Sequence, residues 1–523
     1  MATAPVPPAK SARKKKIVLC CDGTGNEFGA PNPTPIDKNA GKNSNVVKLY
    51  TTLQIDNNQV GYYHPGVGTM GAPTATHWWS REWSKIKGLA FGAGFRDNVL
   101  DAYRYLMEVY NDNGADGNQD EVYIFGFSRG SYTARALAGF LHGYGLLCMG
   151  NEGHIAYAWR MYVAQHDDRG KHHVVPDAAF KETFSHKNFR IQFVGVWDTV
   201  SSVGWISSPM RLFNLAENDT ILRGRHAISI DEHRCFFQDN LWGAPLKGQD
   251  LVQAWFAGVH SDIGGSYLQP ESRLSYITLR WMLSEVGLPP AADGTYPDRP
   301  GIRLNKAHLD LVFGTPPNPI VDPELFYTPP KCSKLHKSLT WKWWLLEILP
   351  HRYYNKDNGK ERRRIPLGLR LRQLPPESLV HESVALLMDA TGSKYKPGNV
   401  RRAELVRRGN DPALPCADGT TYYRFQPENR PPNGILFTLF DRFVVTWLFT
   451  IFDLVILLPA LIWLVLAAAL SLFEVAATLV HVLRLFALHC VPFLTHALVH
   501  WLAFLAALLL CYAHWLQRWW GYL

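Results

Sequence analysis

The residues best suited to chemistry lie between Gly126 and Gly130, where the sequence GFSRG matches the pattern G-x-S-x-G. An apolar run at 122–125 precedes this pentapeptide, and a helix-length stretch rich in alanine and leucine follows it. This is the strand–turn–helix setting of a nucleophile elbow, in which a strained turn presents the serine hydroxyl. Gly126 and Gly130 would let the strand and the helix approach each other closely. The pattern therefore predicts that Ser128 is a nucleophile.

A serine hydroxyl needs a neighbouring base, and the base needs an acid that orients it. In this kind of fold the acid and then the histidine follow the serine along the chain. Asp198 and His260 each come directly after an apolar run. Because the carboxyl ends of parallel strands open onto one crevice, we expect both residues to face Ser128. Asp262 is a rival for the acid, and Asp22 is a more distant one.

An oxyanion hole should complete such a site. One donor is expected to be the backbone N–H of Arg129, the residue after the nucleophile, and the second the N–H of Gly23 or Thr24 in a glycine-rich loop. That loop has neither the dinucleotide-binding nor the P-loop spacing, so phosphate binding is the weaker interpretation. No metal or organic cofactor is expected. The eight cysteines form no CxxC pair, which argues against a structural zinc site.

The elements that must position these residues are short, uniformly apolar runs separated by helix-length stretches. The runs lie at 17–21, 122–125, 191–197 and 252–259. Such runs predict an α/β fold of the α/β-hydrolase type, with a mostly parallel sheet covered by helices. The catalytic domain is expected to span 16–330.

The remaining chain is expected to form three further parts. Residues 1–15 would be a flexible basic tail, and 331–430 an accessory or cap region that completes the catalytic module. Residues 435–523 are strongly apolar, and 454–473 and 485–516 carry no formal charge. Since about 20 apolar residues can cross a bilayer core, the last part is predicted to be helical, transmembrane and associated with the lipid bilayer. The alternatives are a buried helical hairpin or a region covered by a dedicated partner.

Composition and charge set broader limits. The chain has 523 residues, of which 47% are hydrophobic and 19% charged, so it is not a disordered protein. The net charge of +9 comes in part from clusters at 14–16 and 362–364. We interpret these clusters as solvated and expect no nucleic-acid partner. The apolar run at 17–21 is shorter than the roughly 7–15 residues of a signal peptide core, so synthesis in the cytoplasm without a signal peptide is expected.

Several stretches together resemble the uncharacterised-hydrolase domain in the first class of type VI secretion lipase effectors. They lie at 21–26, 126–132, 196–200, 225–233 and 258–267, and the sequence YKPGN at 395–399 resembles the end of that domain. The resemblance implies an α/β-hydrolase core and phospholipase A or related esterase activity. It matches Ser128 to the nucleophile, His260 to the base and Asp198 to one acid position. It also implies export by the type VI secretion machine into a target cell.

The sequence therefore predicts a hydrolase that cleaves acyl esters of membrane phospholipids, used as a secreted antibacterial toxin. Its candidate partners are the lipid bilayer, a spike protein of the secretion machine, a chaperone and an immunity protein. One alternative is an esterase for soluble esters. Another is a membrane-tethered binding or structural protein built on a catalytically silent hydrolase scaffold.

Overall fold

The computed structural model divides the chain into two units, Met1–Asn429 and Arg430–Leu523. The residues that it describes are 14–23, 42–66, 94–112, 119–164, 177–200, 204–205, 208–209, 218–268, 271–288, 294–295, 299–313, 335–347, 351–354, 361–364, 371–390, 395–407, 421–427, 476–481, 483–484 and 503–507. All elements that surround the candidate site belong to the first unit.

A nine-stranded, mostly parallel sheet forms the centre of the first unit, with the strand order β14-β15-β13-β8-β7-β4-β3-β1-β2. Its parallel strands are β1 (Lys16–Cys21), β2 (Gln59–His64), β3 (Glu121–Phe127), β4 (Ile191–Trp197), β7 (Arg223–Ser229), β8 (Asp250–Phe256) and β13 (Leu379–His381). Strands β15 (Tyr422–Phe425) and β14 (Leu405–Arg407) are antiparallel. The expected mostly parallel α/β sheet is therefore present.

The strand order reverses at β1, which pairs with β2 on one side and with β3 on the other. Loops after the two strands that flank such a switch point diverge and leave a crevice at the carboxyl edge of the sheet. The loop after β1 and the turn after β3 are the ones that the sequence predicts to carry the oxyanion hole and the nucleophile. The topology thus positions both at the place where α/β sheets bind ligands.

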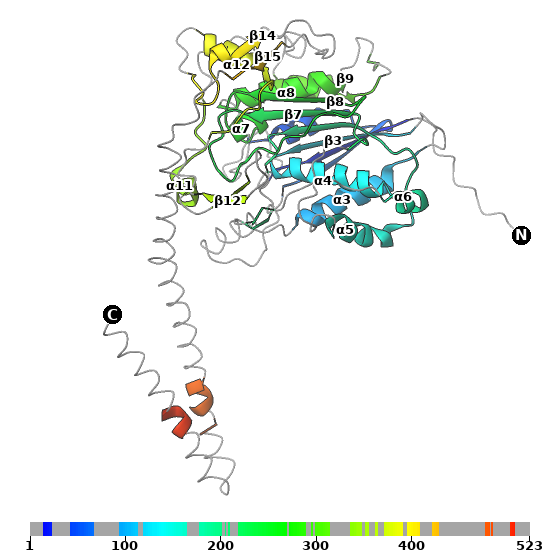
Figure 1. Ribbon diagram of the computed structural model, residues 1–523. Coiled ribbons are helices and arrows are strands. Elements are labelled where there is room, and N and C mark those ends of the chain that lie inside the picture. Colours follow the sequence, from blue (N-terminus) through cyan, green and yellow to red (C-terminus); the bar gives the residue numbers. More distant parts are fainter. Residues whose placement is uncertain are drawn as a thin grey trace, which may run out of the picture. The chain divides into compact units, whose positions relative to one another are not determined.

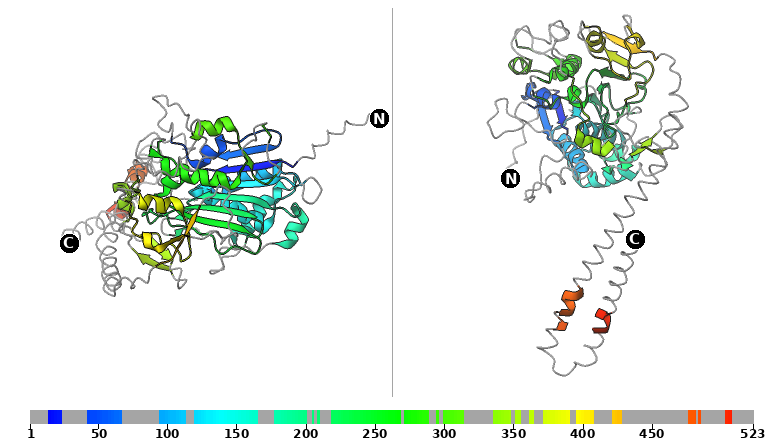
Figure 2. Two further views of the ribbon diagram at one scale, coloured as in Figure 1. Left: turned by 90° about the horizontal axis from the view of Figure 1, so that it is seen from above. Right: turned by 90° about the vertical axis from the view of Figure 1, so that its left-hand side faces the viewer.

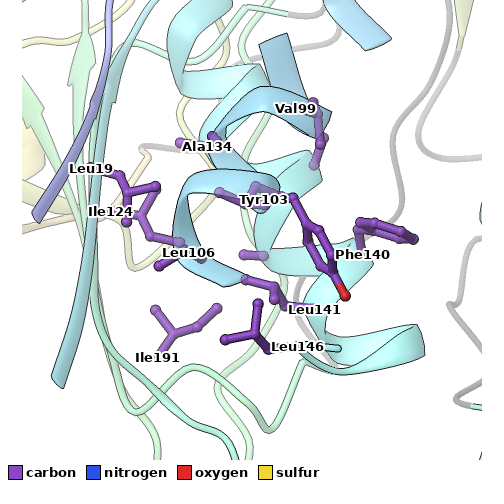
Figure 3. Packing of buried hydrophobic residues seen from close by; sticks show 14 of the residues in the cluster. Leu19, Val99, Tyr103, Leu106, Ile124, Ala134, Phe140, Leu141, Leu146 and Ile191 are labelled. Atoms are coloured by element: carbon purple, nitrogen blue, oxygen red, sulfur yellow. The ribbon is translucent and has the colours of Figure 1, made fainter. Parts of the chain in front are cut away.

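One face of the sheet is covered by α3 (Phe95–Val109), α4 (Arg129–Tyr144), α5 (Ile155–Ala164) and α6 (Ala178–Phe184) (Figure 1). Figure 3 shows the packing at this face, where Leu19, Ile124 and Ile191 from three strands lie near Leu106 of α3. These strand side chains alternate with residues that point to the opposite face, as a pleated strand requires. Because both faces are buried, the strands are apolar at nearly every position.

The opposite face packs against α1 (Asn45–Thr51), α8 (Arg273–Val286) and α9 (Lys306–Phe313). Its cluster contains Val18, Phe125 and Trp197 from the strands and Trp281 from α8. The view from above in Figure 2 shows α8 lying over the strands. The sheet is thus the middle layer of three.

A third hydrophobic cluster lies at the edge of the sheet formed by β13, β15 and β14, where α12 (Glu382–Asp389) packs. The region predicted as accessory, 331–430, therefore adds three strands to the central sheet. Smaller elements of the first unit are η1 (Glu152–His154), β5 (Gly204–Trp205), β6 (Ser208–Pro209), α7 (His260–Gly264), β9 (Gly287–Leu288), β10 (Ile302–Arg303), α11 (Trp341–Glu347), β11 (His351–Tyr354), β12 (Glu361–Arg364) and η4 (Arg402–Glu404).

The basic cluster near the start of the chain is paired within the protein. Lys14 and Lys16 each lie 2.9 Å from a carboxylate oxygen of Glu121, and Lys15 lies 3.1 Å from one of Asp120. These two acids stand at the start of β3, next to β1 in the sheet. These ion pairs link the start of β1 to the start of β3, and the two acids balance most of the charge of the three lysines.

The predicted transmembrane part of the fold is corrected by the structure. Among the described residues, no helix has the length and apolar character needed to cross a membrane. Most of the two uncharged stretches, 454–473 and 485–516, lies outside the described residues.

Candidate active site

Ser128 occupies the sharp turn between β3 and α4. Its backbone has φ 58° and ψ −121°, in a region that non-glycine residues rarely adopt. Its N–H donates to the carbonyl of Trp197 at the end of β4, at 3.1 Å. The hydroxyl of Ser131 braces the same turn, since it contacts the carbonyls of Gly126 at 2.7 Å and Trp197 at 2.9 Å. The turn is therefore held in its strained form by two neighbouring strands.

The two glycines of the pentapeptide make this turn possible. A Cβ added to Gly126 would lie 2.5 Å from the carbonyl oxygen of Gly130. A Cβ added to Gly130 would lie 2.1 Å from the carbonyl oxygen of Cys21, the last residue of β1. Side-chain carbons do not approach backbone atoms so closely, so both positions require glycine. The second contact also brings the start of α4 against the loop after β1.

Asp198 follows β4 directly and is buried. It also has a positive φ, 42°, and its N–H donates to the carbonyl of Ala227 at 2.7 Å. The Ser229 N–H donates to its Oδ1 at 2.9 Å, and the Ser229 hydroxyl lies 3.3 Å from its Oδ2. The carboxylate therefore has a fixed orientation at the carboxyl edge of the sheet.

His260 begins α7, shortly after β8, and is also buried. Its Nδ1 lies 2.5 Å from Oδ2 of Asp198. The ring contacts those of Phe127 and Phe237, whose centroids are each 4.7 Å from the centroid of the imidazole. Phe127 immediately precedes Ser128, so the histidine lies beside the nucleophile turn.

Electrostatics determine which nitrogen of His260 can act as a base. Burial lowers the pKa of His260 despite the opposing effect of Asp198. Burial would raise the pKa of Asp198, but Arg372 and His260 hold it well below its usual range. An ionised carboxylate only accepts hydrogen bonds, so Nδ1 of His260 must donate to it. In the neutral ring, Nε2 is then an acceptor that can take a proton.

The rival acids have other partners. Asp262 accepts from Nδ1 of His336 at 2.7 Å and from the Val259 N–H at 3.1 Å. Asp22 accepts from the Ser44 hydroxyl at 2.8 Å and the Tyr63 hydroxyl at 2.9 Å. The structure thus brings Asp198 to His260, whereas Asp262 and Asp22 serve other parts of the fold.

The candidate oxyanion-hole residues lie at the switch point. Arg129 is the first residue of α4, and N–H groups at a helix start favour negative charge. The Gly23 N–H donates to Oδ1 of Asp22 at 2.6 Å, so this N–H is directed to a carboxylate. Thr24 lies outside the described residues.

Two buried ionic residues of the site were not predicted from the sequence. Arg372 forms an ion pair with Asp198 at 2.5 Å, from 174 residues further along the chain. Glu232 accepts the backbone N–H of His260 at 3.2 Å and pairs with Arg234 at 2.9 Å. Arg234 and hydrogen bonding bring the pKa of Glu232 to about 2 despite its burial. No local pattern marks Arg372, whereas Glu232 stands within the stretch 225–233 that carries the family resemblance.

These features define a mostly parallel α/β fold with a strained serine turn and an aspartate–histidine pair at the carboxyl edge, an arrangement typical of serine hydrolases. The family model described as "T6SS, Phospholipase effector Tle1-like, catalytic domain" matches residues 15–285, more than half of the chain. The chain therefore belongs to this family of type VI secretion phospholipase effectors.

The uncharacterized protein YEL023C of Saccharomyces cerevisiae is 32% identical over 244 residues, which cover 44% of this chain and 33% of that protein. The chain thus matches only about a third of the length of this relative.

Two solved structures show weak likeness, both at 20% identity. An uncharacterized protein from Pseudomonas aeruginosa has a TM-score of 0.31, covering 52% of this chain and 46% of that one. The Tle1 effector bound to the VgrG spike of the type VI secretion system has a TM-score of 0.29, covering 49% and 52%.

Proposed function

We propose that the chain is a serine hydrolase that cleaves carboxylic ester bonds of membrane phospholipids, with phospholipase A-like activity. Membership of the phospholipase effector family supports the substrate class. The observation that carries the chemistry is the contact of 2.5 Å between Nδ1 of His260 and Asp198, next to the strained turn at Ser128.

In the proposed reaction, the Ser128 hydroxyl attacks the ester carbonyl while Nε2 of His260 takes its proton. Asp198 stabilises the imidazolium that forms. The oxyanion is stabilised by the Arg129 N–H and by a second N–H from the loop after β1. Thr24 is the stronger candidate for this second donor, because the Gly23 N–H already donates to Asp22. The imidazolium then protonates the leaving alcohol, and a water activated by His260 releases the fatty acid.

We also propose that the protein is exported by a type VI secretion machine into a target cell, where it degrades lipid. The family membership supports this route. A spike protein of that machine is the proposed partner during export.

The test measures fatty-acid release from phospholipid vesicles with a metal chelator present. Wild type should release fatty acid, and Ser128→Ala should reduce the rate by at least about 1,000-fold. Ser378→Ala is the matched control, because its hydroxyl closes an exposed turn by donating to the Pro375 carbonyl at 2.6 Å. If wild type cleaves a short soluble ester but no vesicle lipid, the triad stands and the lipid assignment fails. If Ser128→Ala keeps the full rate, the proposed mechanism is wrong.

A further inference from the structure

Arg372 makes a two-point contact with the carboxylate of Asp198. One guanidinium nitrogen lies 2.5 Å from Oδ1 and the other 3.1 Å from Oδ2. The same two nitrogens donate to the carbonyls of Ser229 at 3.1 Å and Phe237 at 2.7 Å. Arg372 is itself buried, so this contact is shielded from water and salt. A fork-to-carboxylate geometry of this kind fixes the plane of the carboxylate as well as its charge.

The segment that carries Arg372 is fastened by the YKPGN sequence at 395–399. The Asn399 side-chain amide donates to the carbonyl of Arg372 at 2.9 Å and to that of Ile230 at 3.0 Å. The Tyr395 hydroxyl donates to Asp231 at 2.9 Å. Ile230 and Asp231 come directly after β7, whose last residue, Ser229, also contacts Asp198. The motif therefore joins the Arg372 segment to the strand end that holds the acid.

A buried carboxylate needs such a partner. When His260 is neutral, the charge of Asp198 would otherwise lie in a dry site with only hydrogen bonds to offset it, which is costly. A guanidinium keeps its charge at every pH at which proteins are studied. It therefore keeps Asp198 ionised in both protonation states of His260. It also engages Oδ1 strongly, so that Oδ2 remains directed at the imidazole.

We propose that Arg372 is a positioning residue for the catalytic acid, and that Asn399 and Tyr395 hold it in place. The catalytic unit then extends beyond residue 285, where the match to the family's catalytic domain ends. This inference rests on the proposed function, because it assigns Arg372 a role in the same reaction.

Other charged groups also face this cluster, and their effects must be separated from that of Arg372. Among the described residues, the groups that influence Asp198, His260 or Arg372 electrostatically include His226, Glu232, Arg234 and Asp239. None of them is altered in the variants below, so differences between variants report the loss of Arg372 itself.

The experiment compares the full-length wild type with Arg372→Gln, Arg372→Lys and Arg402→Gln. Arg402 is the matched control, since it also contacts an aspartate through two points, at 2.9 Å to each oxygen of Asp389, but on an exposed surface. Two readouts are needed across pH: steady-state hydrolysis of phospholipid vesicles, and the rate at which a fluorophosphonate probe labels Ser128. The probe reports the triad whatever the natural ester is.

Arg372→Gln should lower kcat and the labelling rate by about 100-fold at neutral pH with little change in KM, as misorientation of a catalytic group does. Loss of a positive charge beside the pair should make His260 easier to protonate, so the acid limb of kcat/KM should move to higher pH. Arg372→Lys keeps the charge without the fork and should restore part of the rate. Arg402→Gln should match wild type.

A folded Arg372→Gln protein with wild-type kcat and an unmoved acid limb overturns the inference. If that variant does not fold, Asn399→Ala decides, because it keeps the guanidinium but releases its backbone. A loss of about ten-fold in kcat at constant KM then supports the inference, and a wild-type rate overturns it. If wild type is inactive, or if Ser128→Ala is fully active, the proposed function itself is wrong. The inference about Arg372 then falls with it.

Discussion

In the described part of the chain, two buried aspartates each contact a histidine, and comparing these pairs shows what an active site needs beyond the pair. His260 contacts Asp198 at 2.5 Å, and His336 contacts Asp262 at 2.7 Å. The two acids are buried to a similar degree, with 1% and 0% of their surfaces exposed. Residue types, the contact distance and the burial of the acid therefore do not distinguish the two pairs.

The surroundings of the two pairs distinguish them. Arg372 and His260 together outweigh burial at Asp198 and lower its pKa, whereas burial prevails at Asp262 and raises its pKa despite the contact with His336. The ring of His260 lies against Phe127, next to the nucleophile turn, while the ring of His336 stacks on Tyr267 at 3.7 Å. A buried pair thus becomes a candidate for catalysis when a nucleophile stands beside it and a fixed cation keeps its acid ionised.

The largest expected effect separates the two pairs directly. Asp198→Asn should lower kcat by about 10,000-fold, because an amide cannot hold the tautomer of His260 or stabilise its charged form. Asp262→Asn should change kcat by less than about ten-fold, since its partners lie outside the proposed reaction. Both are measured as fatty-acid release at saturating vesicle concentration. Equal losses in the two variants would remove the distinction drawn between the pairs.

The nucleophile turn can be broken without touching either pair. Gly130→Ala places a methyl group against the Cys21 carbonyl and should cost about 1–3 kcal/mol of unfolding free energy as well as most of the activity. Gly153→Ala is the control, because nothing lies within 4 Å of its added carbon. Urea unfolding and labelling of Ser128 are the measurements. A Gly130→Ala protein that is as stable and active as the control would contradict the close approach of α4 to β1.

The pH dependence of activity tests the state of His260. Burial lowers its pKa, and a general base works only when it is deprotonated. The acid limb of kcat/KM should therefore have its midpoint below about 6.5, the ordinary pKa of histidine. Initial rates from pH 4.5 to 8 on a soluble ester avoid changes in the vesicles themselves. A midpoint well above 6.5 would show that Asp198 outweighs burial at this ring.

The smallest expected effect is that the two aspartates contribute to the free energy of unfolding with opposite dependence on pH. The folded pKa of Asp198 is lowered, so its contribution is present above about pH 3.9 and is lost as pH falls below that value. The folded pKa of Asp262 is raised, so its contribution is present below about pH 3.9 and is lost as pH rises through the folded value. Asp198→Asn should therefore reduce the free energy of unfolding more at pH 6 than at pH 3. Asp262→Asn should reduce it less at pH 6 than at pH 3.

Each pKa unit corresponds to about 1.4 kcal/mol, which urea unfolding at the two pH values can resolve. Glu377→Gln, which alters an exposed pair with Arg424 at 3.0 Å, should show little dependence on pH and provides the baseline. If the loss of unfolding free energy changed with pH in the same direction for both aspartate variants, the role given to Arg372 would be contradicted.

The sequence by itself determined the parts of this protein that local patterns encode. Uniformly apolar runs predicted the parallel strands, because strands buried on both faces have no polar side. The spacing of Gly126, Ser128 and Gly130 predicted the turn, since only small residues permit that approach. Asp198 and His260 could be proposed together because parallel strands end at one edge. Hydropathy alone also predicted a transmembrane segment, which no helix among the described residues supports.

Only the tertiary structure decided which groups share the site. The contact that favours Asp198 over Asp262 joins His260 to a residue 62 positions earlier in the chain, while Asp262 contacts His336, 74 positions after it. Arg372 reaches Asp198 across 174 residues, from a region whose sequence shows no clear periodicity. Such contacts depend on how distant segments pack, and a single charged residue carries no spacing signal of its own. Burial raises the pKa of Asp262, and Arg372 and His260 lower that of Asp198 despite its burial; both effects likewise exist only once the chain has folded.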